Sequence, residues 1–243
     1  MHVITVCRNS LAGLKLTQAS VQAQRYADLS YAIRDGASTD GTAEFLQQGQ
    51  PCVSQWISEP DRGIYDAMNK ALSTCPDDAW VLFLNAGDRF ASDDVLQRLS
   101  PLLAGDADFI FGDVAIRGAD GVRIYAARRG TRLEMPGCHQ SMLVRASLLK
   151  SQRFDTNYRV GADFEFYLRA TKSRRQVAFF DGTIAEIAPE GFSAANEDLL
   201  QRDYASALRH HRGLAPAAAW LARRKLRAIA LQMRTRLRAG AAR

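Results

Sequence analysis

Hydrophobic positions recur with two different periods along the first half of the chain. Short apolar runs predict strands at residues 3–7, 31–34, 52–57 and 80–84. Between them, residues 10–25, 42–48 and 63–73 have the spacing of amphipathic helices. The run at 80–84 is apolar at every position, which is typical of a strand buried on both faces. Strands that alternate with helices predict right-handed βαβ units and a parallel sheet.

Polar residues follow each of these four strands. In chain order they are Arg8-Asn9, Asp35-Gly36, Glu59-Pro60-Asp61 and Asn85-Ala86-Gly87-Asp88. In open α/β sheets, ligands bind outside the carboxyl ends of the strands. The four groups therefore predict one shared binding site at that edge.

The second half of the chain has a less regular pattern. Residues 109–117 and 122–127 predict a hairpin that turns at 118–121, and residues 176–180 predict a strand. Helical spacing returns at 161–171, 196–211 and 217–238. A change of pattern at 212–216 divides the chain into a domain of residues 1–212 and a helical tail of residues 213–243.

The positive charge of the chain is concentrated in this tail. The 243 residues carry a net charge of +6, yet residues 217–243 contain eight Lys or Arg and no Asp or Glu. The rest of the chain has a net charge of −2. Because nucleic-acid-binding domains usually present basic residues on their main surface, we expect no nucleic-acid partner.

Cysteines and apolar segments bear on the location of the protein. Cys7, Cys52, Cys75 and Cys138 are scattered, which disfavours a disulfide framework or a zinc site and agrees with a reducing cytoplasm. We find no apolar run of the roughly 18–20 residues that span a bilayer. The first ten residues lack the pattern of a secretory signal.

Two acidic segments at strand ends are candidates for chemistry. Asp35 precedes Gly36, and a glycine lets a ligand approach the backbone, although a strand–turn–helix connection explains the same residues. Asp88 follows a buried strand, where a carboxylate is costly without a partner. A divalent cation that bridges a diphosphate would be such a partner, and a turn or helix cap is the alternative.

Two helical segments add further candidates. Tyr65 and Asn69 share a face of the helix at 63–73, and Arg62 near its N-terminus favours a phosphate, or is simply solvated. Asp163 shares a face with aromatic residues, where a carboxylate can serve as a general base. The alternative for that segment is a surface helix with a Glu165–Arg169 ion pair.

The order of five motifs resembles family 2 glycosyltransferases, especially bacterial members that assemble exopolysaccharide, capsule or lipopolysaccharide. The motifs are DGASTDGT, EPDRGIYDAMNKAL, FLNAGD, CHQSMLVR and GADFEFYLR, within about residues 1–200. The resemblance implies an α/β GT-A fold: a Rossmann-like, mainly parallel central sheet flanked by helices, here with a basic helical extension. It also implies an inverting transfer of sugar from a nucleotide-diphosphate donor, commonly with UDP.

The resemblance assigns roles to individual residues. Residues 1–115 would form the nucleotide-binding half and residues 116–212 the acceptor half. Asp163 would be the general base, Asp88 would bind Mg²⁺ or Mn²⁺, and His139 and Gln140 would contact the sugars. The nucleotide or donor would be contacted by Val6, Arg8, Asp35, Gly36, Asp61, Arg62, Tyr65, Asn69, Asn85, Ala86 and Gly87.

Two positions depart from the family pattern. The metal-binding D-x-D region ends in Asp88 but has Asn85-Ala86-Gly87 before it, so one carboxylate remains. The usual Glu-Asp pair reads Ala162-Asp163, so only the base is retained. The reduced D-x-D region keeps open a nucleotide-sugar-binding protein without catalysis. An NAD-dependent enzyme is disfavoured because no G-x-G-x-x-G follows the first strand.

The tail predicts a place for the protein in the cell. Apolar residues from Trp220 to Leu237 recur near helical spacing, with arginines on much of the remaining circumference. Basic amphipathic helices of this kind lie on anionic membrane surfaces. We expect residues 217–243 to lie on the inner face of the cytoplasmic membrane, which suits a saccharide or polyprenyl-diphosphate-linked acceptor. Packing of the tail on the domain or on another subunit is the alternative, and the oligomeric state is not predicted.

Overall fold

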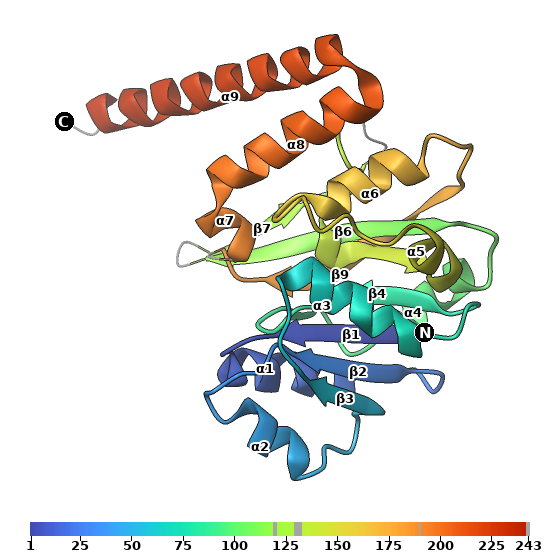
Figure 1. The fold of residues 1–243 in the computed structure, drawn as a ribbon. Helices are drawn as coiled ribbons and strands as arrows, with labels where there is room; N and C mark the ends of the chain where they lie inside the picture. Colours follow the sequence, from blue (N-terminus) through green and yellow to red (C-terminus); the bar gives the residue numbers. More distant parts are fainter. Residues whose placement is uncertain (119–120, 129–132, 190, 242–243) are drawn as a thin grey trace.

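A computed structural model shows the chain folded around one mixed sheet with helices on both faces (Figure 1). The structure describes residues 1–118, 121–128, 133–189 and 191–241, and after Leu226 it describes only the side chain of Met233. The strand order is β3-β2-β1-β4-β8-β6-β9-β5, with β7 paired to β6. The strands are β1 (His2–Cys7), β2 (Ser30–Asp35), β3 (Gln55–Ser58), β4 (Trp80–Phe83), β5 (Arg89–Phe90), β6 (Phe109–Gly118), β7 (Gly121–Tyr125), β8 (Met142–Arg145) and β9 (Val177–Ile187).

The helices include every one that the sequence pattern predicts. They are α1 (Leu11–Gln22), α2 (Thr42–Gln47), α3 (Ile64–Ala71), α4 (Val95–Leu103), α5 (Ala146–Gln152), α6 (Ala162–Ala170), α7 (Phe192–Ala195), α8 (Glu197–Arg212) and α9 (Leu214–Ala241), with 3-10 turns η1 (Leu72–Thr74) and η2 (His139–Ser141). The predicted hairpin is β6–β7, and residues 119–120 of its turn lie outside the described residues. Strands β5 and β8 and helices α4, α5 and α7 were not predicted.

The first four predicted strands form the parallel part of the sheet. β3, β2, β1 and β4 pair in parallel, so their carboxyl ends share one edge, as expected. β8 then runs antiparallel to both β4 and β6, whereas β9 is parallel to β6. The approach to β8 contains the short turn η2 and no described crossover helix, and an antiparallel strand needs none. The α/β class with flanking helices is confirmed, and the later strands make the sheet mixed.

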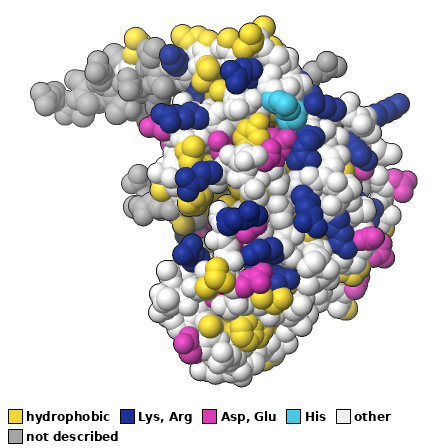
Figure 2. All heavy atoms as spheres, viewed as in Figure 1, with side chains coloured by type: hydrophobic (Ala, Val, Ile, Leu, Met, Phe, Trp, Pro, Cys, Tyr) yellow, Lys and Arg dark blue, Asp and Glu magenta, His cyan; other side chains and the backbone are white. Residues whose placement is uncertain are grey.

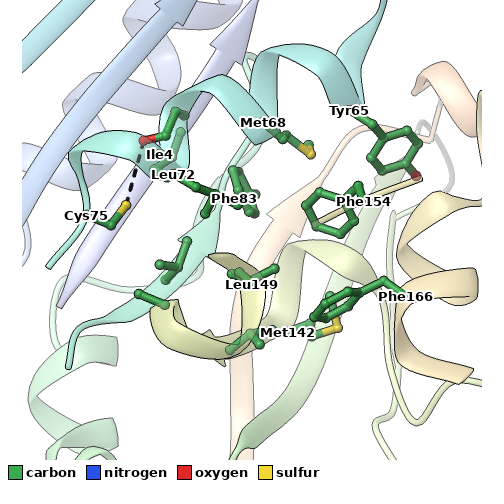
Figure 3. Close-up of a cluster of buried hydrophobic side chains, with 14 of the residues drawn as sticks. Ile4, Tyr65, Met68, Leu72, Cys75, Phe83, Met142, Leu149, Phe154 and Phe166 are labelled. Carbon is green, nitrogen blue, oxygen red and sulfur yellow. Dashed lines mark hydrogen bonds between the residues drawn. The ribbon is translucent and has the colours of Figure 1, made fainter. Parts of the chain in front are cut away.

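Alternate residues of the central strands point into two cores. Ile4 and Phe83 face the cluster covered by α3, α5 and α6, whereas Val3 and Leu82 face the cluster covered by α1, α2 and α4. Both faces are therefore buried, as the continuous apolar run at 80–84 predicts. Figure 3 shows part of the first core, where the ring of Tyr65 lies beside that of Phe154.

The tail helix begins inside the body of the protein. The chain turns at Gly213, which has φ of +96°, and α9 then packs along α8 (Figure 1). Trp220 and Ala217 of α9 are buried with Phe164 and Leu208. The turn coincides with the predicted boundary, but the first turns of α9 pack into the domain. Within the described part of the chain, no helix is both long and apolar enough to cross a membrane.

Candidate active site

A cavity of about 670 Å³ opens beyond the carboxyl ends of β1 and β4. Most of the residues singled out from the sequence line it, although they come from distant parts of the chain. They are Val6, Arg8, Tyr65, Asn85, Ala86, Asp88, His139, Gln140 and Asp163. The polar residues after β1 and β4 thus meet residues of η2 and α6 around one space.

Asp163 lies in the first turn of α6 and is 7% exposed. Its Oδ1 accepts hydrogen bonds from the amide of Phe164 at 2.8 Å and from the hydroxyl of Tyr65 at 3.1 Å. The same hydroxyl lies 2.8 Å from the carbonyl oxygen of Val160. Oδ2 lies 3.8 Å from Nδ1 of His139. One carboxylate oxygen is therefore fixed by the protein, and the other is placed to act on a ligand.

The imidazole ring of His139 lies beside Asp163 and packs against an aromatic ring. Its ring stacks on Phe83, with centroids 5.7 Å apart and planes 19° apart. Neither ring nitrogen has a hydrogen-bond partner among the described residues. Burial lowers the pKa of His139, and the charge of Asp163 opposes this only in part. The imidazole is therefore neutral near pH 7 and can offer one donor and one acceptor to a ligand.

Asp88 ends a tight turn that Thr17 holds in place. The Asp88 amide donates to the carbonyl of Asn85 at 2.9 Å, and the Thr17 hydroxyl donates to the carbonyl of Asp88 at 2.6 Å. Burial raises the pKa of the Asp88 carboxyl to about 7, while a hydrogen bond from Gln140 acts in the opposite direction. The unpaired amide oxygen of Asn85 is buried beside this turn.

These groups bear on metal binding. Among the described residues, no cluster of three or more His, Cys, Asp or Glu side chains could hold a metal ion. Asp88 and Asn85 nevertheless offer a desolvated carboxylate and an unpaired amide oxygen, which are ligands that Mg²⁺ and Mn²⁺ prefer. The two residues fit a cation whose remaining ligands come from an anionic molecule in the cavity.

Asp35, Gly36 and Asp61 lie next to the cavity rather than in its lining. The carboxylate of Asp35 accepts hydrogen bonds from the Ser38 amide at 3.0 Å and the Ser58 hydroxyl at 2.6 Å. Asp35 and Asp61 border a separate small depression. A Cβ on Gly36 would lie 2.3 Å from Oδ2 of Asp61 and 3.4 Å from Cβ of Arg8, so a larger residue here would displace the Asp61 side chain. Gly36 therefore lies beside Arg8, and Arg8 lines the main cavity.

The structure does not bring Arg62, Asn69 and Gly87 into the cavity lining. The Arg62 side chain is 83% exposed and pairs with Asp66 at 3.1 Å. Asn69 exchanges hydrogen bonds of 2.8 and 2.9 Å with the backbone of Phe154, which positions that ring beside Tyr65. Gly87, with φ of +102°, allows the turn that precedes Asp88.

The far wall of the cavity was not predicted. It contains Ile116, Arg123, Tyr125, Phe192, Leu200, Tyr204, Trp220, Arg223 and Arg224. Two patterns could have indicated it. Arg123 and Tyr125 are two residues apart on β7 and share a face, and Trp220, Arg223 and Arg224 have the i, i+3, i+4 spacing of one helical face. Neither pattern shows that the two faces meet.

Sequence comparisons place this chain in a known family. The family model described as Glycosyl transferase family 2 matches residues 2–172. An uncharacterized glycosyltransferase of Mycobacterium tuberculosis is 34% identical over 179 residues, covering 70% of this chain and 68% of that protein. A PGL/p-HBAD biosynthesis glycosyltransferase of Mycobacterium bovis is 29% identical over 175 residues, covering 69% of this chain and 68% of the relative.

Solved structures confirm the GT-A fold. Residues 1–349 of Staphylococcus aureus TarS in complex with UDP-GlcNAc give a TM-score of 0.68 at 18% identity, covering 87% of this chain and 67% of that chain. The mannosyltransferase PcManGT of Pyrobaculum calidifontis, in complex with GDP-Man and Mn²⁺, gives a TM-score of 0.66 at 21% identity, covering 99% of this chain and 79% of that chain.

Proposed function

The chain belongs to glycosyl transferase family 2, and we propose that it transfers a sugar from a nucleotide-diphosphate donor to a hydroxyl group of a saccharide-containing acceptor. One observation carries the proposal: Asp88 and the buried, oriented Asp163 line the same cavity. A carboxylate that can take a proton and a carboxylate that can help to hold a diphosphate are the two acidic groups that such a transfer needs.

In the proposed reaction, Asp163 accepts the proton of the acceptor hydroxyl. The acceptor oxygen forms a bond to the anomeric carbon on the face opposite the leaving group, and the bond from that carbon to the diphosphate oxygen breaks. The sugar inverts its configuration through a transition state with oxocarbenium character. The contacts of Tyr65 and Phe164 with Oδ1 support this role because they orient the base before the substrate arrives.

The donor would lie at the carboxyl ends of the parallel strands, with UDP as the nucleotide. TarS in complex with UDP-GlcNAc has the same fold. Val6, Arg8 and Ala86 line this side of the cavity, and Asp35, Gly36 and Asp61 border it. Asp35 would contact the base, and the α3 N-terminus near Arg62 would favour the phosphates.

Asp88 and Asn85 would hold Mg²⁺ or Mn²⁺ together with the donor diphosphate. PcManGT was solved with Mn²⁺. When bound, the cation would neutralise charge on the leaving diphosphate. Gln140 orients Asp88 through its hydrogen bond, and neutral His139 would contact the donor sugar or the acceptor.

The acceptor would be a saccharide or a lipid-linked saccharide in bacterial surface-polysaccharide or glycolipid synthesis, with a hexose or an N-acetylhexosamine transferred. A relative named for PGL/p-HBAD biosynthesis supports this class of product. Residues 1–115 would bind the nucleotide and residues 116–212 the acceptor. The basic end of residues 213–243 would place the protein on the inner face of the cytoplasmic membrane.

A ligand screen followed by an activity assay tests the proposal. Thermal shift with UDP-, GDP- and dTDP-sugars, each with and without Mn²⁺, should show one selectively stabilising donor, because a ligand of the folded state raises the melting temperature. Release of UDP that depends on a saccharide acceptor would then establish transfer. Donor binding without any acceptor-dependent release would instead favour a non-catalytic nucleotide-sugar-binding protein. Absence of stabilisation by every nucleotide sugar would overturn the proposal.

A further inference from the structure

The two ends of the cavity are lined by different sets of charged residues. Asp88 and Asp163 lie where β4 and α6 meet it. The far wall carries Arg123 of β7 and Arg223 and Arg224 of α9. Figure 1 places α8 and α9 at the opposite end of the molecule from β1, β2 and β3. The arginine wall therefore lies away from the strands that would hold the nucleotide.

The arginines of this wall are presented by regular structure. On β7, Arg123 and Tyr125 line the cavity and the intervening Ile124 does not, as the two-residue period of a strand requires. On α9, Trp220 is buried against the domain, and this anchor directs the same helical face, with Arg223 and Arg224, toward the cavity. The pairing of β7 with β6 and the packing of Trp220 therefore fix the positions of these residues, which do not lie in a loop.

Among the residues that the structure describes, two of the three arginines have no ion-pair partner. Arg224 pairs with Glu197 and lies over the ring of Trp220, 5.5 Å from its centroid. Arg123 and Arg223 are exposed and form no ion pair with any residue that the structure describes. Glu134 also lines the cavity, but the arginines outnumber it. This wall therefore offers positive charge to an incoming ligand.

Apolar and aromatic groups surround these charges. Ile116 is opposite Arg123 in the β6–β7 pairing, and Tyr125 and Phe192 are 50% and 55% exposed at the cavity. A guanidinium group binds phosphate oxygens through paired N–H donors, and exposed aromatic rings contact sugar or hydrocarbon. The wall thus combines recognition of an anion with recognition of an apolar or saccharide surface.

We propose that Arg123 and Arg223 form an acceptor subsite that binds a phosphate or diphosphate group of the acceptor substrate. The inference rests on the proposed function, and it adds that the acceptor is phosphorylated. The acceptor hydroxyl lies at Asp163 while its phosphate group lies at the wall formed by β7 and α9. A lipid-linked diphosphate saccharide and a soluble sugar phosphate share this chemistry.

The test measures binding of two probes, inorganic pyrophosphate and farnesyl diphosphate, to the full chain held at saturating UDP and Mn²⁺. Calorimetry on R123Q/R223Q should show at least about tenfold weaker binding of the probe, since a charged contact with phosphate changes affinity by roughly tenfold. The matched control R202Q/R209Q removes two exposed arginines of α8 that do not line the cavity, and it should retain probe affinity. The UDP affinity of both variants should match that of the unmodified chain.

Each outcome decides between defined alternatives. Tighter binding of farnesyl diphosphate than of pyrophosphate, lost in R123Q/R223Q, supports the subsite with a lipid-linked acceptor. Equal binding of the two probes, lost in the same variant, supports it with a soluble phosphorylated acceptor. Unchanged probe binding in R123Q/R223Q, an equal loss in R202Q/R209Q, or displacement of the probe by UDP overturns the inference. Failure of UDP itself to bind would contradict the proposed function instead.

Discussion

The hydroxyl of Tyr65 lies 3.1 Å from Oδ1 of Asp163, although the two residues are 98 positions apart in the chain. The contact links α3 to α6 across the cavity wall. The ring of Tyr65 packs against Phe154, with centroids 5.3 Å apart, and burial raises the pKa of its phenol. The phenol therefore stays protonated, and its single proton is shared between the carbonyl oxygen of Val160 at 2.8 Å and Oδ1 of the proposed base at 3.1 Å.

Replacing Tyr65 with Phe should lower kcat by about tenfold, because a hydrogen bond to a charged group contributes about 1.5–3 kcal/mol. Although the family resemblance also made Tyr65 a candidate donor contact, its hydroxyl faces Asp163 and Val160, so the affinity for UDP should remain within about twofold. Steady-state kinetics and calorimetry give the two values. Tyr26→Phe, which removes a hydroxyl outside the cavity, is the matched control. An unchanged kcat in Y65F would remove the positioning role from Tyr65.

The variant Asp163→Asn keeps the shape of the side chain and removes its ability to accept a proton. We expect transfer to fall by about 10²–10⁴-fold, the usual contribution of a general base. UDP should still bind and should still raise the melting temperature. Asp181→Asn, an exposed position outside the cavity, should leave both measurements unchanged. Near-normal transfer by D163N would show that another group is the base.

The pattern of apolar and polar residues was sufficient to predict the N-terminal half of the fold, where the donor is proposed to bind. β1, β2 and β4 are buried on both faces; β4 is apolar at every position, and β1 and β2 contain short apolar runs, which made them readable as parallel strands. The amphipathic spacing at residues 63–73 predicted α3 and the following turn η1, whose Met68 and Leu72 lie in the core. Once the strands were parallel, the common edge for Arg8 and Asp88 followed from topology alone.

Features that depend on tertiary contacts were not predictable in this way. β8 has only four residues, and nothing in Met142–Arg145 indicates that it pairs antiparallel between β4 and β6. For Glu165, the alternative of a surface helix is wrong, because the helix is buried under α8 and the residue is 3% exposed, although the Glu165–Arg169 ion pair of that alternative is present. The arginine wall requires that α9 pack back on α6 and α8, which Trp220 makes possible.

Asp88 should make the ligand-free protein less stable as the pH rises. Its pKa is raised from 3.8 to about 7 in the folded state, so between these values the unfolded chain loses the proton before the folded chain does. The stability contribution is present below pH 3.8 and is lost as the pH rises to about 7. Asp88→Asn, which cannot ionise, should therefore gain about 1–2 kcal/mol over the unmodified chain at pH 8, after discounting for solvent screening.

Urea unfolding at pH 4 and pH 8 measures this difference. The gain for D88N should be small at pH 4 and present at pH 8, and Mn²⁺-dependent stabilisation by UDP should be lost in the same variant. Asp94→Asn, whose exposed carboxyl has a lowered pKa, provides a control of opposite sign. Equal stability differences at the two pH values would contradict the burial of Asp88.

Glu165 lies two residues from Asp163 on α6, but its contacts indicate a structural role. It forms a bidentate pair with Arg169 at 2.9 Å and lies 2.7 Å from Nε2 of His211 on α8. Glu165→Gln should lower the free energy of unfolding by about 2–3 kcal/mol, because it leaves the partly buried guanidinium of Arg169 without its charge partner. The kcat per folded molecule should change little. Glu197→Gln, in an exposed pair, should cost no more than about 0.5 kcal/mol.

The part of α9 that is proposed to bind the membrane follows the part that packs on the domain. Trp220 packs into the domain, whereas the five arginines after Lys225 come later in the chain. A chain ending at Lys225 should keep its melting temperature but lose co-sedimentation with phosphatidylglycerol vesicles, since each basic residue near an anionic surface contributes about 1 kcal/mol. A chain ending at Arg212 should also lose stability, because it exposes Phe164 and Leu208. Neither the full chain nor the shorter ones should bind neutral phosphatidylcholine vesicles. If the chain ending at Lys225 binds anionic vesicles as well as the full chain does, residues 226–243 are not the site of attachment.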